Sequence, residues 1–475
     1  MRIIIRGVPR SRPSYSKYLS KSPTRHYSHS SNSSPKAFTF ASQQKDGDAL
    51  LSQLKEKLGS ANSESYDAAV VLGTPGLARL LANDSFIGGL SNSLLTPSSG
   101  KGTHVVTAAV DRLAPVGSVT VEEGISVLRG RLDDILPGIW NPQAPRPKED
   151  ADTVSALTFG LSDGSITLPL ARTVFYHQRV STLVATCFQA SGTEAAPTVA
   201  RQTEPRLAHI NLPTSATMAG ASFQLPLIPL THARKVLESF GNIVRGVEVD
   251  GKRTPGSTEL EEIANKMYSL DNYAPEAGPM SIWALVTPGT ETAETSQLVE
   301  PDPGEMFELL SSGKGLEQLT SRTSEYVAQC HRQSGRLYKL LSGGGGWGQK
   351  AGLLALDPQL THFSQSDEEA MEKFLSFSQG HRNLGYVPPG SRIQFFAGAP
   401  PSVNFRSESE EGYLFGVQRE TSSGLDETKH DKLWLGRFGA LSSSSSGIFL
   451  KNHGSSLSEP GSRITVPGSL LAISS

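Results

Sequence analysis

The sequence predicts an α+β protein with two mixed α/β halves, the C-terminal half ending in an antiparallel β meander. Three observations support this fold class. An apolar strand at residues 68–72 runs through a turn containing Gly73, Pro75 and Gly76 into a helical segment, which is how an α/β layer begins. A strand-turn-strand pattern occupies residues 157–170, and short apolar runs separated by turn residues follow residue 386. At 475 residues the chain has room for two or three domains.

The composition narrows the class of protein. Apolar residues make up 37% of the chain and the mean hydropathy is −0.26, values typical of a soluble globular protein. No apolar run approaches the ~20 residues needed to cross a bilayer, so we expect no transmembrane segment. Cys187 and Cys330 lie far apart, which argues against a disulfide framework or a thiolate zinc site. The scattered histidines form no H-x-H or H-x-x-x-H pair, so we expect no metal site, and the cofactor stays unknown.

The first 45 residues contain nine Lys or Arg and no Asp or Glu. Arginine mixed with isoleucine at the start is typical of an amphipathic mitochondrial presequence, and the segment around Arg25 resembles a processing site with cleavage after Tyr27. The alternative is a basic tail that binds nucleic acid or a membrane surface, but such a tail need not exclude every acid. We therefore expect a mitochondrial matrix protein.

Cleavage after Tyr27 removes seven basic residues and takes the formal charge from −2 to −9. An acidic body has no general attraction to phosphate backbones, so nucleic acid is not expected as a partner.

We divide the chain into residues 1–45, a transit peptide and disordered basic segment, 46–300, an N-terminal α/β domain, and 301–475, a C-terminal α+β domain. Apolar spacing and capping signals predict helices at residues 48–58, 231–240, 258–268, 305–310, 316–341 and 367–377. Apolar and β-branched runs predict strands at residues 68–72, 103–110, 244–249 and 281–286, and then at 392–397, 412–418, 433–440, 447–452, 463–466 and 470–473.

Residues 157–170 form the clearest local pattern. Apolar residues alternate on both sides of Asp163-Gly164, so a two-residue turn there pairs Leu161 with Ile166 and places six apolar side chains on one face. Residues 160–164 also match G-x-S-x-G, but a nucleophile elbow needs a helix after the serine. Here a strand follows, so we interpret the match as a hairpin turn.

The least ordinary stretch is the run of four glycines that leads into Trp347. So many glycines cost backbone entropy unless something must approach the chain closely. The run is not a Walker A motif, because Gln349 precedes Lys350 and Ala351 replaces the hydroxyl residue. The spacing of Gly346, Gly348 and Gly352 is only weakly like a dinucleotide loop, and a helix rather than a strand is expected before it.

We expect this run to line a ligand pocket in which backbone N–H groups and cationic side chains hold an anionic ligand and Trp347 is an apolar wall. The alternative is structural, with Trp347 in the core and Lys350 in solvent. The predicted ligand-binding residues are Gly343, Gly344, Gly345, Gly346, Trp347, Gly348, Lys350, Arg437 and Arg392.

The strand after Tyr66, the 157–170 hairpin, the glycine-rich stretch and the segments FFAGAPP and LGRFGA together resemble fungal mitochondrial proteins of the FIST domain type. The resemblance covers roughly residues 66–475. It implies N-terminal and C-terminal FIST halves and a role in sensing or binding small ligands such as amino acids. The chain has a transit peptide but no F-box, kinase or receptor segment, which departs from the signalling members. No catalytic residues are carried over.

Three hypotheses for function follow. The first is a non-catalytic protein that binds a small amino-acid-like or anionic molecule, or a protein partner. The second is an enzyme acting on a nucleotide or acyl substrate, in which His177 and the glycine loop converge on one cleft. The third is a mitochondrial assembly or scaffold factor with a large exposed apolar patch.

Overall fold

The computed structural model describes the greater part of the chain after residue 35. The described residues are 36–58, 65–96, 102–117, 119–141, 154–189, 198–213, 215–269, 280–289, 298–312, 314–343, 352–357, 387–400, 403, 411–419, 431–450 and 461–474.

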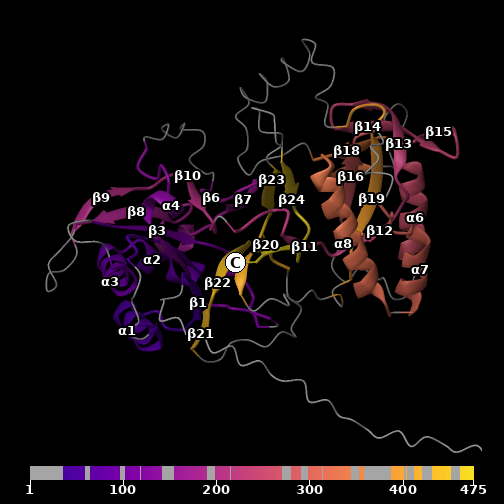
Figure 1. Ribbon diagram of the computed structural model, residues 1–475. Helices are drawn as coiled ribbons and strands as arrows, with labels where there is room; N and C mark the ends of the chain where they lie inside the picture. The colour runs from indigo at the N-terminus through magenta and orange to yellow at the C-terminus, as the bar shows by residue number, and fades with distance from the viewer. Residues whose placement is uncertain are drawn as a thin grey trace, which may run out of the picture.

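The protein is α+β and rich in strands, as the sequence predicts (Figure 1). Its helices are α1 (Gly47–Leu58), η1 (Pro75–Leu77), α2 (Ala78–Leu81), α3 (Asp84–Leu94), α4 (Leu132–Ile135), α5 (Val174–His177), α6 (Thr258–Tyr268), α7 (Pro303–Ser312) and α8 (Leu316–Arg332). None of these described helices is long and apolar enough to span a membrane.

A seven-stranded mixed sheet organises the N-terminal part. Its order is β21-β1-β5-β2-β3-β8-β9, and the β2–β3 pair is parallel while its other pairs are antiparallel. The strands are β1 (Ala37–Ala41), β2 (Ala68–Gly73), β3 (Thr103–Ala109), β5 (Gly124–Gly130), β8 (Leu183–Phe188), β9 (Val199–Thr203) and β21 (Lys432–Leu435).

This sheet is covered on both faces. Successive side chains of β2 point to opposite faces of the sheet, and all of them are buried. Ala69 and Val71 lie in a core shared with Leu50 and Leu54 of α1. Val70 lies in a second core on the opposite face, with residues of two smaller sheets. Helices, the large sheet and the small sheets therefore form three layers.

Each smaller sheet has five strands. One has the order β10-β6-β7-β23-β24 and the other β11-β25-β20-β22-β4. Stacking of the Phe159 and Phe415 rings, with centroids 4.3 Å apart, joins them. Their strands are β4 (Arg112–Leu113), β6 (Ala156–Leu161), β7 (Gly164–Pro169), β10 (Leu207–Asn211), β11 (Ser222–Gln224), β20 (Gly412–Val417), β22 (Arg437–Ser442), β23 (Ser446–Leu450), β24 (Ser462–Ile464) and β25 (Leu470–Ile473).

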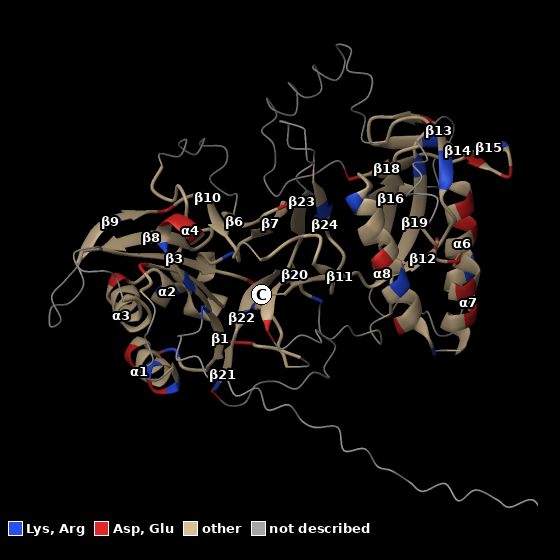
Figure 2. Ribbon diagram, viewed as in Figure 1, with Lys and Arg blue, Asp and Glu red and all other residues tan. Residues whose placement is uncertain are grey.

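A six-stranded antiparallel β-barrel forms the other end of the molecule, flanked by α6, α7 and α8 (Figure 1 and Figure 2). Its order is β19-β13-β14-β18-β17-β16, and pairing of β16 with β19 closes it. Two short strands, β12 and β15, pair with β19 and β14 from outside the ring. The strands are β12 (Leu227–Pro229), β13 (Arg234–Phe240), β14 (Ile243–Val249), β15 (Lys252–Pro255), β16 (Ile282–Thr287), β17 (Arg336–Gly343), β18 (Leu354–Leu356) and β19 (Arg392–Gly398).

The two faces of the barrel wall belong to different cores. On β19, Ile393 and Phe395 share an apolar core with α6 and α7. Phe396 instead joins the central core, together with Val327 and Cys330 of α8. The barrel takes strands from both sides of residue 300, since β13, β14 and β16 precede it and β17 to β19 follow it.

The hairpin at residues 156–169 has the predicted shared face but a different register. Phe159 pairs with Ile166 and Leu161 with Gly164, so the two-residue turn is Ser162-Asp163, not Asp163-Gly164. The Asp163 carboxylate explains this choice, because it accepts hydrogen bonds from the Met218 and Ala219 N–H groups. Ser162 therefore lies in a hairpin turn, and the nucleophile-elbow interpretation is excluded.

Two predicted helical segments contain strands. Residues 234–240 form β13, which pairs with β14 through a turn at Gly241, whose φ is +58°. Helix α8 ends at Arg332, because Ser334 adopts a left-handed conformation with φ +67° and interrupts the helix, and β17 follows. In both places barrel pairing outweighs helix propensity.

The predicted antiparallel meander is wrong. The terminal strands exist, but β19 belongs to the barrel, β21 to the large sheet, and the remaining five, β20 and β22 to β25, to the two small sheets. In addition, β20 and β22 pair in parallel. Apolar alternation predicts which residues extend, whereas strand order depends on contacts between distant segments.

Candidate functional site

The predicted glycine-rich site falls largely outside the described residues. Gly344 to Gly348, including Trp347, and Lys350 are in that part of the chain. Gly343 is the last residue of β17 and pairs with Leu354 of β18. A Cβ added at Gly343 would lie 2.4 Å from the Leu354 Cδ2 atom, so close packing against β18 accounts for a glycine at this position.

The surrounding strands change the interpretation of this run. A strand, β17, leads into it, where a helix was expected, and β18 then returns antiparallel to β17. The run therefore connects neighbouring antiparallel strands. A dinucleotide or phosphate loop instead needs a helix N-terminus after the turn, so this topology gives the nucleotide interpretation no support.

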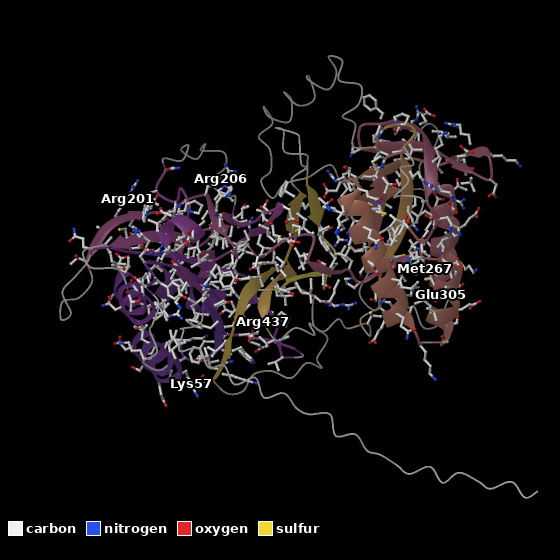
Figure 3. The ribbon with its side chains drawn as sticks, in the orientation of Figure 1. Lys57, Arg201, Arg206, Met267, Glu305 and Arg437 are labelled. Atoms are coloured by element: carbon white, nitrogen blue, oxygen red, sulfur yellow. The ribbon has the colours of Figure 1, made fainter. Side chains whose placement is uncertain are left out.

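Arg437 lies in β22, at the centre of the molecule (Figure 3). It is 1% exposed, its Nη2 donates to the Pro115 carbonyl oxygen at 3.3 Å, and its own carbonyl oxygen accepts from Thr39 Oγ1 at 3.1 Å. Burial lowers the pKa of its guanidinium. The main-chain contact joins β22 to β1, and the guanidinium donates to the chain just after β4, so Arg437 is a buried structural residue.

Arg392 and Gly343 are at opposite ends of the barrel. Arg392 pairs with Thr287 at the end of β16, where Arg336 begins β17. Gly343 ends that eight-residue strand, about 23 Å farther along it. The described members of the predicted pocket, Gly343, Arg392 and Arg437, therefore do not form one site.

Arg392 instead borders a polar cluster between the barrel wall and α8. We call it the Glu300 cluster, and it consists of Thr231, His232, Glu300, Tyr326, Cys330, Arg392 and Gln394. Strand β19 supplies the residues at 392 and 394, and α8 supplies those at 326 and 330. The chain before β13 and before α7 supplies the others.

Hydrogen bonds fix the carboxylate of Glu300. Its Oε1 atom accepts from the Ala233 N–H at 2.7 Å and from Gln394 Nε2 at 3.2 Å, and it lies 3.3 Å from His232 Nδ1. The hydrogen bonds that Glu300 receives from described residues all go to Oε1. The side chain is 26% exposed, so Oε2 is placed to accept from a further donor.

Gln394 is 1% exposed. Its Nε2 also donates to the Thr231 carbonyl oxygen at 3.0 Å, and these two acceptors fix the orientation of the amide. Its Oε1 is buried and has no hydrogen-bond partner among the residues that the structure describes. A buried acceptor left unpaired costs about 1–3 kcal/mol, so a donor at this position would stabilise the cluster.

Tyr326 and Cys330 complete the α8 side and are neutral at physiological pH. Burial raises the pKa of the Cys330 thiol to about 11, although the Tyr326 hydrogen bond and Arg392 act in the opposite direction. Burial, then Cys330 and Glu300, raise the pKa of the Tyr326 phenol. The cluster thus combines a carboxylate, a guanidinium and neutral donors, which suits binding more than attack by a thiolate.

His177 belongs to a separate place in the fold. Its Nε2 lies 2.6 Å from Thr182 Oγ1, next to β8 of the large sheet, whereas Gly343 ends a barrel strand. Burial, and then Arg179, lower the pKa of His177. His177 and Gly343 therefore do not converge.

Sequence reasoning selected only Arg392 of the Glu300 cluster and missed its six other members, which are Thr231, His232, Glu300, Tyr326, Cys330 and Gln394. No motif spacing identifies them, because the contact between Glu300 and Gln394 spans 94 residues. The available signal was a lone cysteine on a predicted helix that also carries Tyr326 one turn earlier.

Comparison of the chain with protein-family models, with curated proteins and with solved structures returned no match.

Proposed function

We propose that this protein binds a small zwitterionic, amino-acid-like molecule at the Glu300 cluster and does not transform it. Arg392 is the partner for a ligand carboxylate, Glu300 Oε2 for an ammonium group, and Gln394 Oε1 for a second N–H donor. The observation that carries the proposal is the buried, unpaired Gln394 Oε1 beside a carboxylate whose described hydrogen bonds leave Oε2 accessible. Charged and amide groups converging on one ligand give orientation and specificity.

The FIST-like resemblance supports the same class of ligand, because that family is proposed to sense small molecules such as amino acids. We extend it to the architecture, with residues 46–300 and 301–475 as FIST N-like and FIST C-like parts. In this proposal the Glu300 cluster lies at the boundary between the two parts, because the barrel takes strands from both sides of residue 300.

The proposed compartment is the mitochondrial matrix, on the basis of the acid-free basic N-terminus. Import into isolated mitochondria followed by N-terminal sequencing tests this. We expect a mature chain that begins at Ser28, and a full-length chain left outside the organelle contradicts the assignment.

A screen of thermal stability tests the ligand class. A ligand at a hundred times its Kd stabilises the folded chain by about 2.7 kcal/mol, so a matching free amino acid raises the melting temperature. We expect Arg392→Gln to abolish this shift. Arg245→Gln is the matched control, because Arg245 is on β14 of the same barrel and half exposed, paired with Glu238. If no amino acid shifts the wild type, or if Arg392→Gln responds like the wild type, the proposal fails.

A further inference from the structure

Helix α5 carries a contiguous exposed apolar tip. Phe175 is 96% exposed, and its neighbours Val174 and Tyr176 are 42% and 40% exposed. No other large apolar side chain in the described part of the chain is as exposed as Phe175. Single apolar residues are common on surfaces, but three consecutive ones on a projecting turn indicate a surface that contacts something.

Hydrogen bonds at its base hold the tip in place. The Arg179 N–H donates to His177 Nδ1 at 3.3 Å, so His177 Nε2 carries the proton that faces Thr182 Oγ1 at 2.6 Å. Thr182 Oγ1 donates to Thr173 Oγ1 at 3.1 Å, and Thr173 Oγ1 donates to the Arg179 carbonyl oxygen at 3.1 Å. Thr173 and Thr182 are fully buried. The apolar turn thus projects from a base in which the polar side chains of Thr173, His177 and Thr182 are hydrogen-bonded.

The surroundings of the tip are cationic. Arg79, Arg172 and Arg179 are exposed, and Arg79 Nε donates to the Tyr176 carbonyl oxygen, which ties α2 to the tip. One of these charges is balanced, since Arg179 forms a 2.8 Å ion pair with Glu204. The sequence has no Asp or Glu between Asp163 and Glu194.

We propose that this tip, residues 172–179, docks on an anionic lipid surface. Phe175 enters the acyl boundary, Val174 and Tyr176 lie at the level of the headgroups, and Arg79 and Arg172 contact lipid phosphates. Apolar insertion combined with nearby basic residues is the chemistry of reversible peripheral attachment. A protein partner would need a contact face of about 800 Å² on each side, whereas a four-residue helix that projects from its surface suits a bilayer, which needs no complementary pocket.

Flotation of the full chain with vesicles tests the proposal. The vesicles are pure phosphatidylcholine or phosphatidylcholine with about a third phosphatidylserine. We expect Phe175→Ser to lower the partition coefficient on anionic vesicles about tenfold, and Arg172→Glu to lower it by a similar factor. The matched control is Phe240→Ser, because Phe240 is 68% exposed on the barrel and is expected to leave partitioning unchanged. The basic N-terminus is the same in all four proteins, so its contribution to vesicle binding cancels when their partition coefficients are compared.

A second measurement reports insertion directly. Phe175→Trp is expected to give a blue-shifted fluorescence increment on anionic vesicles, and Phe240→Trp none. The proposal is overturned if Phe175→Ser partitions onto anionic vesicles like the wild type, or if Phe240→Ser lowers the partition coefficient as much as Phe175→Ser does. It is also overturned if the wild type binds pure phosphatidylcholine vesicles as well as anionic ones. A photocrosslinker at position 175 that captures one protein and no lipid also overturns it and identifies a protein partner instead.

Discussion

His331 makes the fold sensitive to acid, and the effect can be calculated. His331 is 5% exposed on α8, and both of its ring nitrogens are buried with no hydrogen-bond partner in the described part of the chain. Burial, reinforced by Arg336 and Arg332, lowers its pKa from 6.5 to about 3. The folded chain therefore keeps this imidazole neutral at a pH where the unfolded chain protonates it.

The direction in which pH changes the free energy of unfolding follows from proton binding. Below pH 6.5 the unfolded state binds more protons at this residue, so the free energy of unfolding falls as the pH falls from about 6.5 towards 3. At pH 5 the unfolded imidazole is almost fully protonated and the folded one is not. The loss relative to pH 8 is then about 2 kcal/mol from this residue alone.

The perturbation is His331→Phe, which keeps an aromatic ring near Phe223, whose centroid is 6.4 Å away. Removing two unpaired buried nitrogens is expected to stabilise the protein at pH 8 by about 1–3 kcal/mol. The substitution also removes the 2 kcal/mol loss. His331→Leu gives a second test in case the larger ring strains the packing.

Urea unfolding followed by tryptophan fluorescence at pH 8 and pH 5 measures this difference. Carboxylates also titrate in this range, so the informative quantity is the difference between variant and wild type. His209→Phe is the control, because His209 is exposed on β10. Equal losses between pH 8 and pH 5 in the wild type, His331→Phe and His331→Leu would refute the reasoning.

Two further predictions concern thiols and strand packing. Ellman's reagent is expected to label half-buried Cys187 of the native protein before buried Cys330, because burial raises the pKa of the Cys330 thiol to about 11. Mass spectrometry of peptides gives the order of labelling. Faster labelling of Cys330 would contradict its burial. Gly416→Ala is expected to destabilise the fold by well over 2 kcal/mol in calorimetry, because its Cβ would lie 2.0 Å from the Ser469 carbonyl oxygen. Gly117→Ala is the control, because Gly117 has φ +60° and open space around it, and it is expected to lower the free energy of unfolding by only about 1 kcal/mol. Equal destabilisation by the two substitutions would show that β20 and β25 can move apart to admit the methyl group.

Local patterns predicted local structure well. Helix α6 has the predicted bounds, because the acids of its first turn and its apolar spacing act within one segment. The six apolar residues of the 157–170 hairpin are all buried, because period-2 alternation fixes the face even when the register differs.

Closure of the barrel could not be predicted, because it depends on distant pairing. Strands β16 and β19 pair over six residues, from Ile282 with Ala397 to Thr287 with Arg392, although more than a hundred residues separate them in the chain. The helical composition of residues 231–240 concealed β13, whose edge is completed only when β14 and β19 lie beside it.

The candidate site shows the same limit. Arg392 was selected for its charge, and the structure places it at a cluster that no sequence motif or spacing identifies. Arg437 was selected for the same reason and is a buried contact between layers. Glycine content marked residues 343–348 as unusual, and the role of the part beyond Gly343 stays a prediction.

The ligand specificity of the Glu300 cluster tests the central claim most directly. Isothermal titration compares a free amino acid with its N-acetyl and carboxamide derivatives, in the wild type, Glu300→Gln and Arg392→Gln. The wild type is expected to bind the free amino acid at least tenfold more tightly than either derivative. Glu300→Gln should lose discrimination against the N-acetyl form only, and Arg392→Gln against the carboxamide only. If the wild type binds all three ligands equally, or if the two variants change affinity for all three by the same factor, the cluster does not recognise the two charges of a zwitterionic ligand.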